Sequence, residues 1–109
     1  MALKIIFMGS PNFAVPILKA INESKHKILE VYTQPATKSG RGQKLNHSDI
    51  FHCAEQLNLS VRSPDTLETN EEINHFKNLK PDLVVVVAYG KILPSKLLNA
   101  DKLLFINAH

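Results

Sequence analysis

Cysteine, acidic clusters and long apolar runs are scarce in this chain of 109 residues. The single cysteine, Cys53, cannot form an internal disulfide, which fits a protein kept in a reducing cytoplasm. The longest strongly apolar run, 83–89, is far shorter than a membrane-spanning helix, which needs roughly 20 residues. The apolar run before Gly9 is also shorter than a signal-peptide core, usually about 7–15 residues. We therefore expect a cytoplasmic protein with no membrane partner.

Metal ligands and nucleotide-binding glycines are missing at the spacings that such sites need. The histidines at 26, 47, 52 and 75 show no metal-ligand spacing with each other or with Cys53, so we predict no metal site. Residues 3–24 suggest a strand, a glycine turn and a helix, but a dinucleotide fingerprint would need glycines where Gly9, Pro11 and Ala14 stand. No acidic residue closes the second apolar segment, so NAD is not expected. The segment 39–44 lacks the P-loop spacing.

Acidic residues are absent from 33–48, a polar segment that is much longer than the usual βα loop of about 2–6 residues. The formal net charge of the chain is +3, and this segment supplies all of that excess. Its three basic residues are Lys38, Arg41 and Lys44. Two glycines flank the arginine, which would let a phosphate approach its guanidinium and the backbone together. The segment is therefore either a solvated surface loop or an arm that binds the phosphates of RNA or a nucleotide.

Apolar and amphipathic segments alternate along the chain, which predicts an α/β fold with a parallel, doubly wound sheet. Strands are expected at 3–8, 28–34, 60–62, 83–89 and 103–107. Helices are expected at 13–24, 48–57, 70–79 and 95–99. Ser10 or Asn12 could cap the first helix, and Thr69 is predicted to cap the third.

An amide and an imidazole close the last predicted strand. Because side chains alternate along a strand, Asn107 and His109 should point to the same side of the sheet. In open parallel sheets, ligands bind at the carboxyl ends of the strands. The pair therefore predicts half of an active site, although an Asn and a His could also simply end the strand.

Three motifs in this order cover the chain from end to end. They are 4–16 (KIIFMGSPNFAVP), 33–45 with its Gly-Arg-Gly, and 81–94 (PDLVVVVAYGKILP) followed by 106–109 (INAH). Together they resemble the amino-terminal part of the methionyl-tRNA formyltransferase family. The resemblance implies a Rossmann-like sheet of about five strands in the order 3-2-1-4-5, with helices on both faces. It also implies that 1–109 is the first part of a formyltransferase catalytic domain, with no second domain present.

The resemblance further implies a reaction: the transfer of a formyl group from 10-formyltetrahydrofolate to the amino group of methionine on initiator tRNA. Asn107 and His109 match two of the three catalytic residues of the family. An amide N–H and an imidazole suit the oxyanion that forms when an amine attacks a formyl carbon, and His can take the proton. The folate pocket of the family matches Tyr89, Gly90, Lys91, Ile92 and Leu93. Its tRNA-binding loop matches 35–45, with Arg41 foremost, then Lys44 and Lys38.

Departures from the family leave other functions open. The Ser-Leu-Leu-Pro run and the later catalytic Asp of the family do not follow His109, so the isolated chain is expected to be inactive. Lys91 stands where the family often has Gln. A last strand at the sheet edge would invite self-association. Two alternatives are a non-catalytic RNA-binding module and a formyltransferase for a nucleotide or sugar amine, although the Gly-Arg-Gly loop argues against the second.

Overall fold

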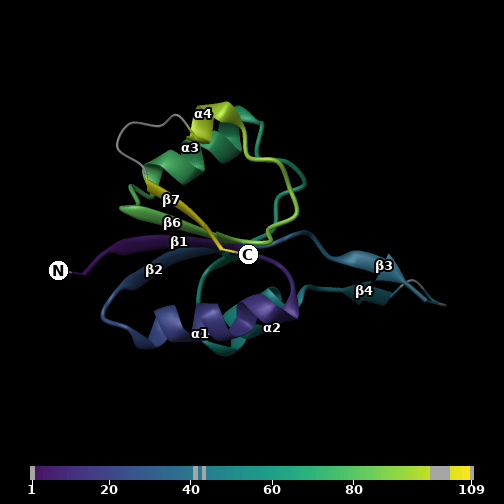
Figure 1. The fold of residues 1–109 in the computed structure, drawn as a ribbon. Helices are drawn as coiled ribbons and strands as arrows, with labels where there is room; N and C mark the ends of the chain where they lie inside the picture. The colour runs from purple at the N-terminus through teal and green to yellow at the C-terminus, as the bar shows by residue number, and fades with distance from the viewer. Residues whose placement is uncertain (1, 41, 43, 99–103, 109) are drawn as a thin grey trace.

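The computed structural model describes residues 2–40, 42, 44–98 and 104–108. Five strands form one parallel sheet in the order β5-β2-β1-β6-β7 (Figure 1). Their bounds are β1 (Lys4–Gly9), β2 (Lys27–Tyr32), β5 (Val61–Arg62), β6 (Leu83–Val87) and β7 (Leu104–Ala108). Numbered among themselves, these strands have the order 3-2-1-4-5, so the predicted topology is confirmed. β7 lies at the edge of this sheet, and self-association through it stays a prediction.

Helices cover both faces of the sheet, as the resemblance implied. α1 (Val15–Glu23) and α2 (Asp49–Gln56) lie on one face, and α3 (Asn70–Asn78) and α4 (Ser95–Leu98) lie on the other (Figure 1). Alternate residues of β1 enter the two cores: Ile5 and Phe7 pack toward α1 and α2, whereas Ile6 and Met8 pack on the other face. A strand buried on both faces needs apolar residues at every buried position, which explains the apolar run at 5–8.

The cap predicted for the third helix is confirmed, the cap predicted for the first helix is wrong, and the cap of the second helix was not predicted. The Thr69 hydroxyl accepts the N–H of Glu72 at 3.2 Å, which confirms Thr69 as the cap of α3. Ser48 caps α2 in the same way. The predicted first helix instead begins as a 3-10 turn, η1 (Asn12–Ala14), without a side-chain cap. The prediction that Ser10 or Asn12 caps it is wrong, because the Ser10 hydroxyl bonds instead to Tyr89 and Gln34, which follow the ends of β6 and β2.

The predicted loop at 33–45 contains a β-hairpin, which corrects the sequence analysis. Its strands, β3 (Thr37–Ser39) and β4 (Lys44–Asn46), pair antiparallel and project away from the body of the fold (Figure 1). Gly40 and Gly42 both have positive φ, 74° and 84°, in the reversal between the two strands. Glycine adopts this conformation without the cost that a side chain adds.

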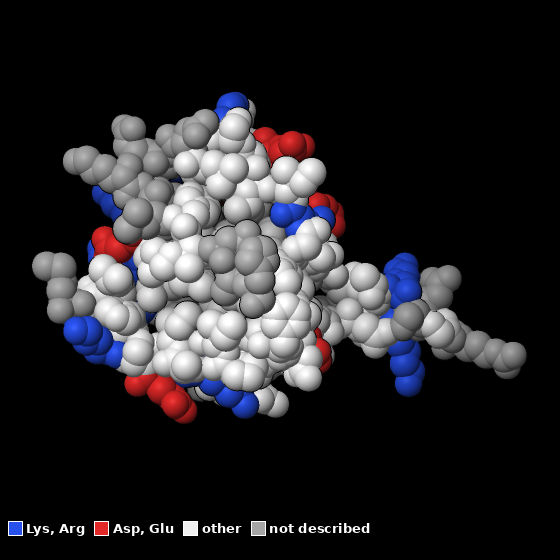
Figure 2. All heavy atoms as spheres, in the orientation of Figure 1, with Lys and Arg blue, Asp and Glu red and all other residues white. Residues whose placement is uncertain are grey.

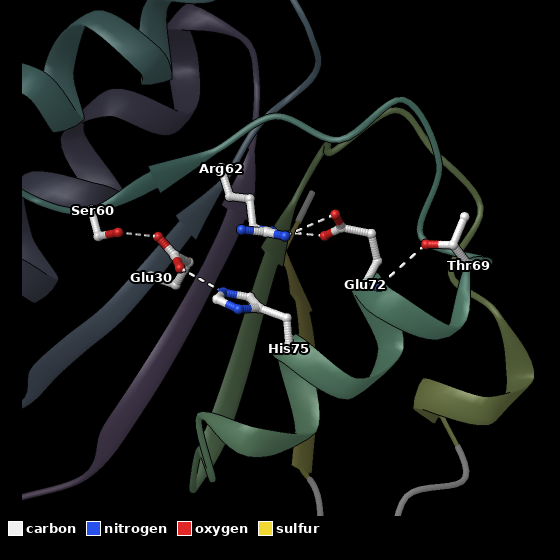
Figure 3. A network of polar contacts seen from close by, with 6 residues as sticks. All are labelled: Glu30, Ser60, Arg62, Thr69, Glu72 and His75. Atoms are coloured by element: carbon white, nitrogen blue, oxygen red, sulfur yellow. Dashed lines mark hydrogen bonds and ion pairs between the residues drawn. The ribbon is translucent and has the colours of Figure 1, made fainter.

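A polar network docks α3 against the β2–β5 edge of the sheet (Figure 3). The carboxylate of Glu30 on β2 is only 5% exposed and accepts hydrogen bonds from the Ser60 hydroxyl and from Nε2 of His75, the latter at 3.0 Å. Beside it, Arg62 donates to both carboxylate oxygens of Glu72, at 2.7 and 2.9 Å. A buried carboxylate is tolerated only when such partners replace its water.

Candidate functional site

The carboxyl ends of three strands meet in one row. Gly9 on β1 lies opposite Val87 on β6, and Val87 lies opposite Ala108 on β7. A Cβ at Gly9 would lie 2.9 Å from the Val87 carbonyl oxygen, so the two strand ends approach too closely for any side chain there. From β1 the chain continues to β2 on one side of the sheet, and from β6 it continues to β7 on the other side. The order in which strands are added therefore reverses between β1 and β6. Open α/β sheets bind ligands at this kind of switch point.

The exit of β6 is a sharp bend at 88–94. Ala88 and Gly90 have φ of 49° and 89°, and the Tyr89 ring turns back into the core. Leu93 packs against the edge of that core, whereas the Ile92 side chain is 90% exposed. An apolar side chain held in water beside a switch point is suited to contact a ligand.

The bend borders a cavity of about 230 Å³, which is lined by Lys91, Ile92 and residues 65–68. Lys91 crosses the surface to donate its ammonium group to the Asp65 carbonyl at 2.7 Å. The predicted cofactor-binding residues therefore take three different positions: Tyr89 is buried, Lys91 holds a neighbouring loop, and Ile92 remains open to a ligand. Their cofactor-binding role stays a prediction. No group of three or more metal-ligating side chains occurs within the described ranges.

A chain of hydroxyl groups lies directly behind the bend. The Ser10 hydroxyl donates to the Tyr89 carbonyl at 3.0 Å and accepts the N–H of Gln34 at 3.2 Å. Thr33 donates to Ser10 at 3.3 Å, and its oxygen lies 2.5 Å from that of Ser48. Sequence reasoning considered Ser10 only as a helix cap, because contacts between residues 79 positions apart leave no local signal.

The projecting hairpin carries positive charge on both faces. Cross-strand partners share a face, and the register pairs Lys38 with Leu45 and Ser39 with Lys44. Lys38 and Lys44 therefore extend to opposite faces, and Figure 2 shows blue groups on both sides of the hairpin. Arg41, which the sequence analysis ranked first for tRNA binding, lies outside the described residues.

The predicted catalytic pair is described only in part. Asn107 lies on β7 with its backbone opposite Val86, one position before the row of strand ends. His109 lies outside the described residues. The expectation that the two side chains share one orientation remains a prediction.

Comparison with known proteins identifies the family of this chain. The profile of the family described as "Formyl transferase" matches residues 3–109. The chain belongs to the formyl transferase family. Methionyl-tRNA formyltransferase of Pelagibacter ubique is 56% identical over 110 residues, which cover 100% of this chain and 36% of that protein. The enzyme of the same name from Alkaliphilus oremlandii is 49% identical over 98% of this chain and 34% of its own length. The chain thus spans about a third of these curated relatives.

Solved structures support the fold of this formyl transferase chain. Glycinamide ribonucleotide transformylase 1 from Symbiobacterium toebii matches 95% of the chain and 50% of its own length, with a TM-score of 0.62 and 12% identity. Phosphoribosylglycinamide formyltransferase from Streptococcus pneumoniae matches 94% of the chain and 54% of its own length, with a TM-score of 0.59 and 17% identity. The expected Rossmann-like fold is therefore confirmed. Within the described ranges, this formyl transferase chain has no helix that meets the length and apolarity required to span a membrane.

Two buried tyrosines of this formyl transferase lie near the site and resist ionisation. Burial, and next the nearby charge of Glu72, raise the pKa of Tyr89 to about 12. Burial also raises the pKa of Tyr32, and the charge of Glu30 adds to the effect. Neither phenol hydroxyl has a hydrogen-bond partner among the described residues. Both groups therefore favour the folded state only while they are protonated.

Alkaline stability should depend on Tyr89. Its pKa rises on folding from 10.0 to about 12, so its contribution is complete below pH 10 and is lost as pH rises through 12. The unfolding free energy of the parent chain should therefore fall between about pH 9 and 11. In Tyr89→Phe this fall should be smaller by about 1 kcal/mol, because no phenol ionises at that position. Urea titrations at both pH values measure the difference. Equal losses in the two proteins would contradict the assignment, and Tyr32→Phe serves as the parallel variant.

Proposed function

We propose that this chain is the amino-terminal part of the catalytic domain of a cytoplasmic methionyl-tRNA formyltransferase. In this proposal the enzyme moves a formyl group from 10-formyltetrahydrofolate to the amino group of methionine on initiator tRNA. The observation that carries the proposal is the identity of 56%, along the whole chain, to a protein of that name. The glycinamide ribonucleotide enzymes match in fold but share only 12% and 17% identity. Their substrate therefore does not support an assignment for this chain.

The bend after β6 has the chemistry that a folate requires. A pterin is a flat ring whose rim bears hydrogen-bond donors and acceptors, so it needs apolar contact together with backbone polar groups. Ile92 offers an apolar side chain that is 90% exposed beside the cavity. The positive φ of Gly90 turns the backbone at the same point. We assign Tyr89–Leu93 to the formyl donor on these grounds.

The reaction itself is assigned to the end of β7. In this proposal the Asn107 amide donates a hydrogen bond to the formyl oxygen, on which negative charge grows as the amine attacks. His109 takes the proton that the attacking amine loses. β7 pairs directly with β6, so the strand that carries Asn107 lies beside the strand that leads into the bend.

The hairpin is assigned to tRNA. A duplex groove has a phosphate backbone along each wall, and a hairpin with Lys38 on one face and Lys44 on the other can reach both walls. In this proposal Arg41, which lies between the two lysines in the sequence, provides a further phosphate contact through its guanidinium. This arrangement gives affinity through phosphates rather than through base recognition.

Binding of 10-formyltetrahydrofolate to the chain, measured by isothermal titration calorimetry, tests the proposal. Ile92→Asp should weaken binding at least about tenfold, because it removes apolar contact and adds a charge beside an apolar ring. Leu98→Asp on α4 is the matched control, since Leu98 is also exposed, at 47%, but lies outside the bend. Absence of folate binding, or equal weakening by both substitutions, would reject the assignment of the bend.

A further inference from the structure

We infer that Ser10 is a positioning residue that holds the bend and the hairpin in one fixed relation. The inference rests on the proposed function for what the two segments do. Ser10 follows β1 directly and stands between the first residues of both segments. Its hydroxyl donates to the carbonyl of Tyr89, near the start of the bend, and accepts the N–H of Gln34, where the chain leaves β2 for the hairpin.

The donors and acceptors of the hydroxyl chain fix its direction. A hydroxyl has one hydrogen to donate, and Thr33 donates its hydrogen to Ser10. Ser48 must therefore be the donor in its 2.5 Å contact with Thr33, while it accepts the N–H of Phe51 at 3.0 Å. The bonds run in one direction from the start of α2 to the Tyr89 carbonyl, an order in which each bond polarises the next. Ser10 itself accepts two hydrogen bonds and donates one, so its bonding capacity is filled.

Both ends of the hairpin are hydrogen-bonded to this row of hydroxyl groups. Gln34 precedes β3, and Ser48 follows β4. The arm therefore leaves and rejoins the body of the protein at two residues that reach Ser10, one directly and one through Thr33. The base of the hairpin is therefore held at both sides, although β3 and β4 project away from the body of the fold.

A packing contact joins the arm to the bend independently of the hydroxyl groups. The side chain of Gln34 lies against Gly90 so closely that a Cβ at Gly90 would be 1.8 Å from Gln34 Nε2. Gly90 also has φ of 89°, so both space and backbone geometry favour glycine there. Gln34 thus touches Ser10 through its backbone and the bend through its side chain.

Amide hydrogen exchange in the ligand-free chain tests the inference. In Ser10→Ala, the segments 34–46 and 89–93 should both exchange about tenfold faster, because hydrogen bonds to both are lost, while β1 and β6 keep their protection. Ser10→Thr keeps the hydroxyl and should restore slow exchange in both segments. Ser24→Ala is the matched control: its hydroxyl donates to the Ile21 carbonyl at the far end of α1, and its loss should change neither segment.

The outcomes separate positioning from general support of the fold. Uniform acceleration across the sheet, acceleration of only one segment, or failure of Ser10→Thr to restore protection would overturn the inference. Should Ser10→Ala not fold, two other variants replace it. Thr33→Val should speed the exchange of 34–46, and Gln34→Ala should speed the exchange of 89–93. Unchanged exchange in either variant would contradict the inference. The measurement needs no ligand, so absence of folate or tRNA binding would reject the proposed function and leave this inference standing.

Discussion

Replacing Lys38, Arg41 and Lys44 together with alanine should weaken the binding of initiator tRNA about 500-fold at about 0.1 M salt. Each phosphate contact contributes about 0.9 to the slope of log affinity against log salt concentration, and this variant loses three such contacts. The expectation follows from the charge distribution, because these residues carry the whole formal excess of +3 in the sequence. It also follows from the register of the hairpin, which sends the two lysines to opposite faces. Filter binding across a range of salt concentrations measures both the affinity and the slope.

A matched triple variant makes this test specific. Lys4, Lys25 and Lys27 are exposed basic residues at the amino-terminal end of the sheet, opposite the end from which the hairpin projects. Replacing these three lysines removes the same charge and should leave the salt slope unchanged. Equal weakening by both triple variants would mean that tRNA responds only to net charge, and the hairpin would then not be its binding site.

Loss of His75 should cost about 2–3 kcal/mol of unfolding free energy, because His75→Ala leaves a buried carboxylate short of a partner. The carboxylate is that of Glu30, of which only 6% of the side chain is exposed (Figure 3). The Ser60 hydroxyl would remain as its only hydrogen-bond donor among the contacts drawn there. Urea unfolding at neutral pH, followed by circular dichroism, measures the change.

The double variant separates the lost bond from the stranded charge. In Glu30→Met/His75→Leu both polar partners are replaced by apolar side chains, so the double variant should be less destabilised than His75→Ala alone. His52→Ala provides the control, because His52 is an exposed histidine on α2 and its loss should change stability by less than about 0.5 kcal/mol. A His75→Ala protein as stable as the parent chain would show that Glu30 does not need this partner.

Local sequence signals were sufficient wherever an element has a buried face. The five sheet strands were predicted from apolar runs, and the cap at Thr69 was predicted from its position before two acidic residues, whereas the strand order came from the family resemblance. Strand ends were less certain: the strand predicted to reach Tyr89 ends at Val87, because Ala88 takes a positive φ and turns the chain. Nothing in the apolar run of residues marks that turn.

The hairpin escaped prediction because the side chains described between 37 and 46 are exposed. All three residues of β4 are exposed, so no alternation of apolar and polar residues records the strand. Nothing in the sequence singles out Glu30 either, since its partners Ser60 and His75 lie 30 and 45 positions away. Such contacts form only after the elements have packed together.

The sequence by itself determined the layered α/β architecture, the family and the positions of the residues proposed for chemistry, because hydrophobic periodicity and motif spacing are properties of neighbouring residues. Tertiary structure alone decided that Ser10 bonds to the bend and the arm instead of capping a helix, and that Lys38 and Lys44 face opposite ways. The physical reason is that a hydroxyl or ammonium group can satisfy itself in many ways, and only the packed strands determine which partners come within reach.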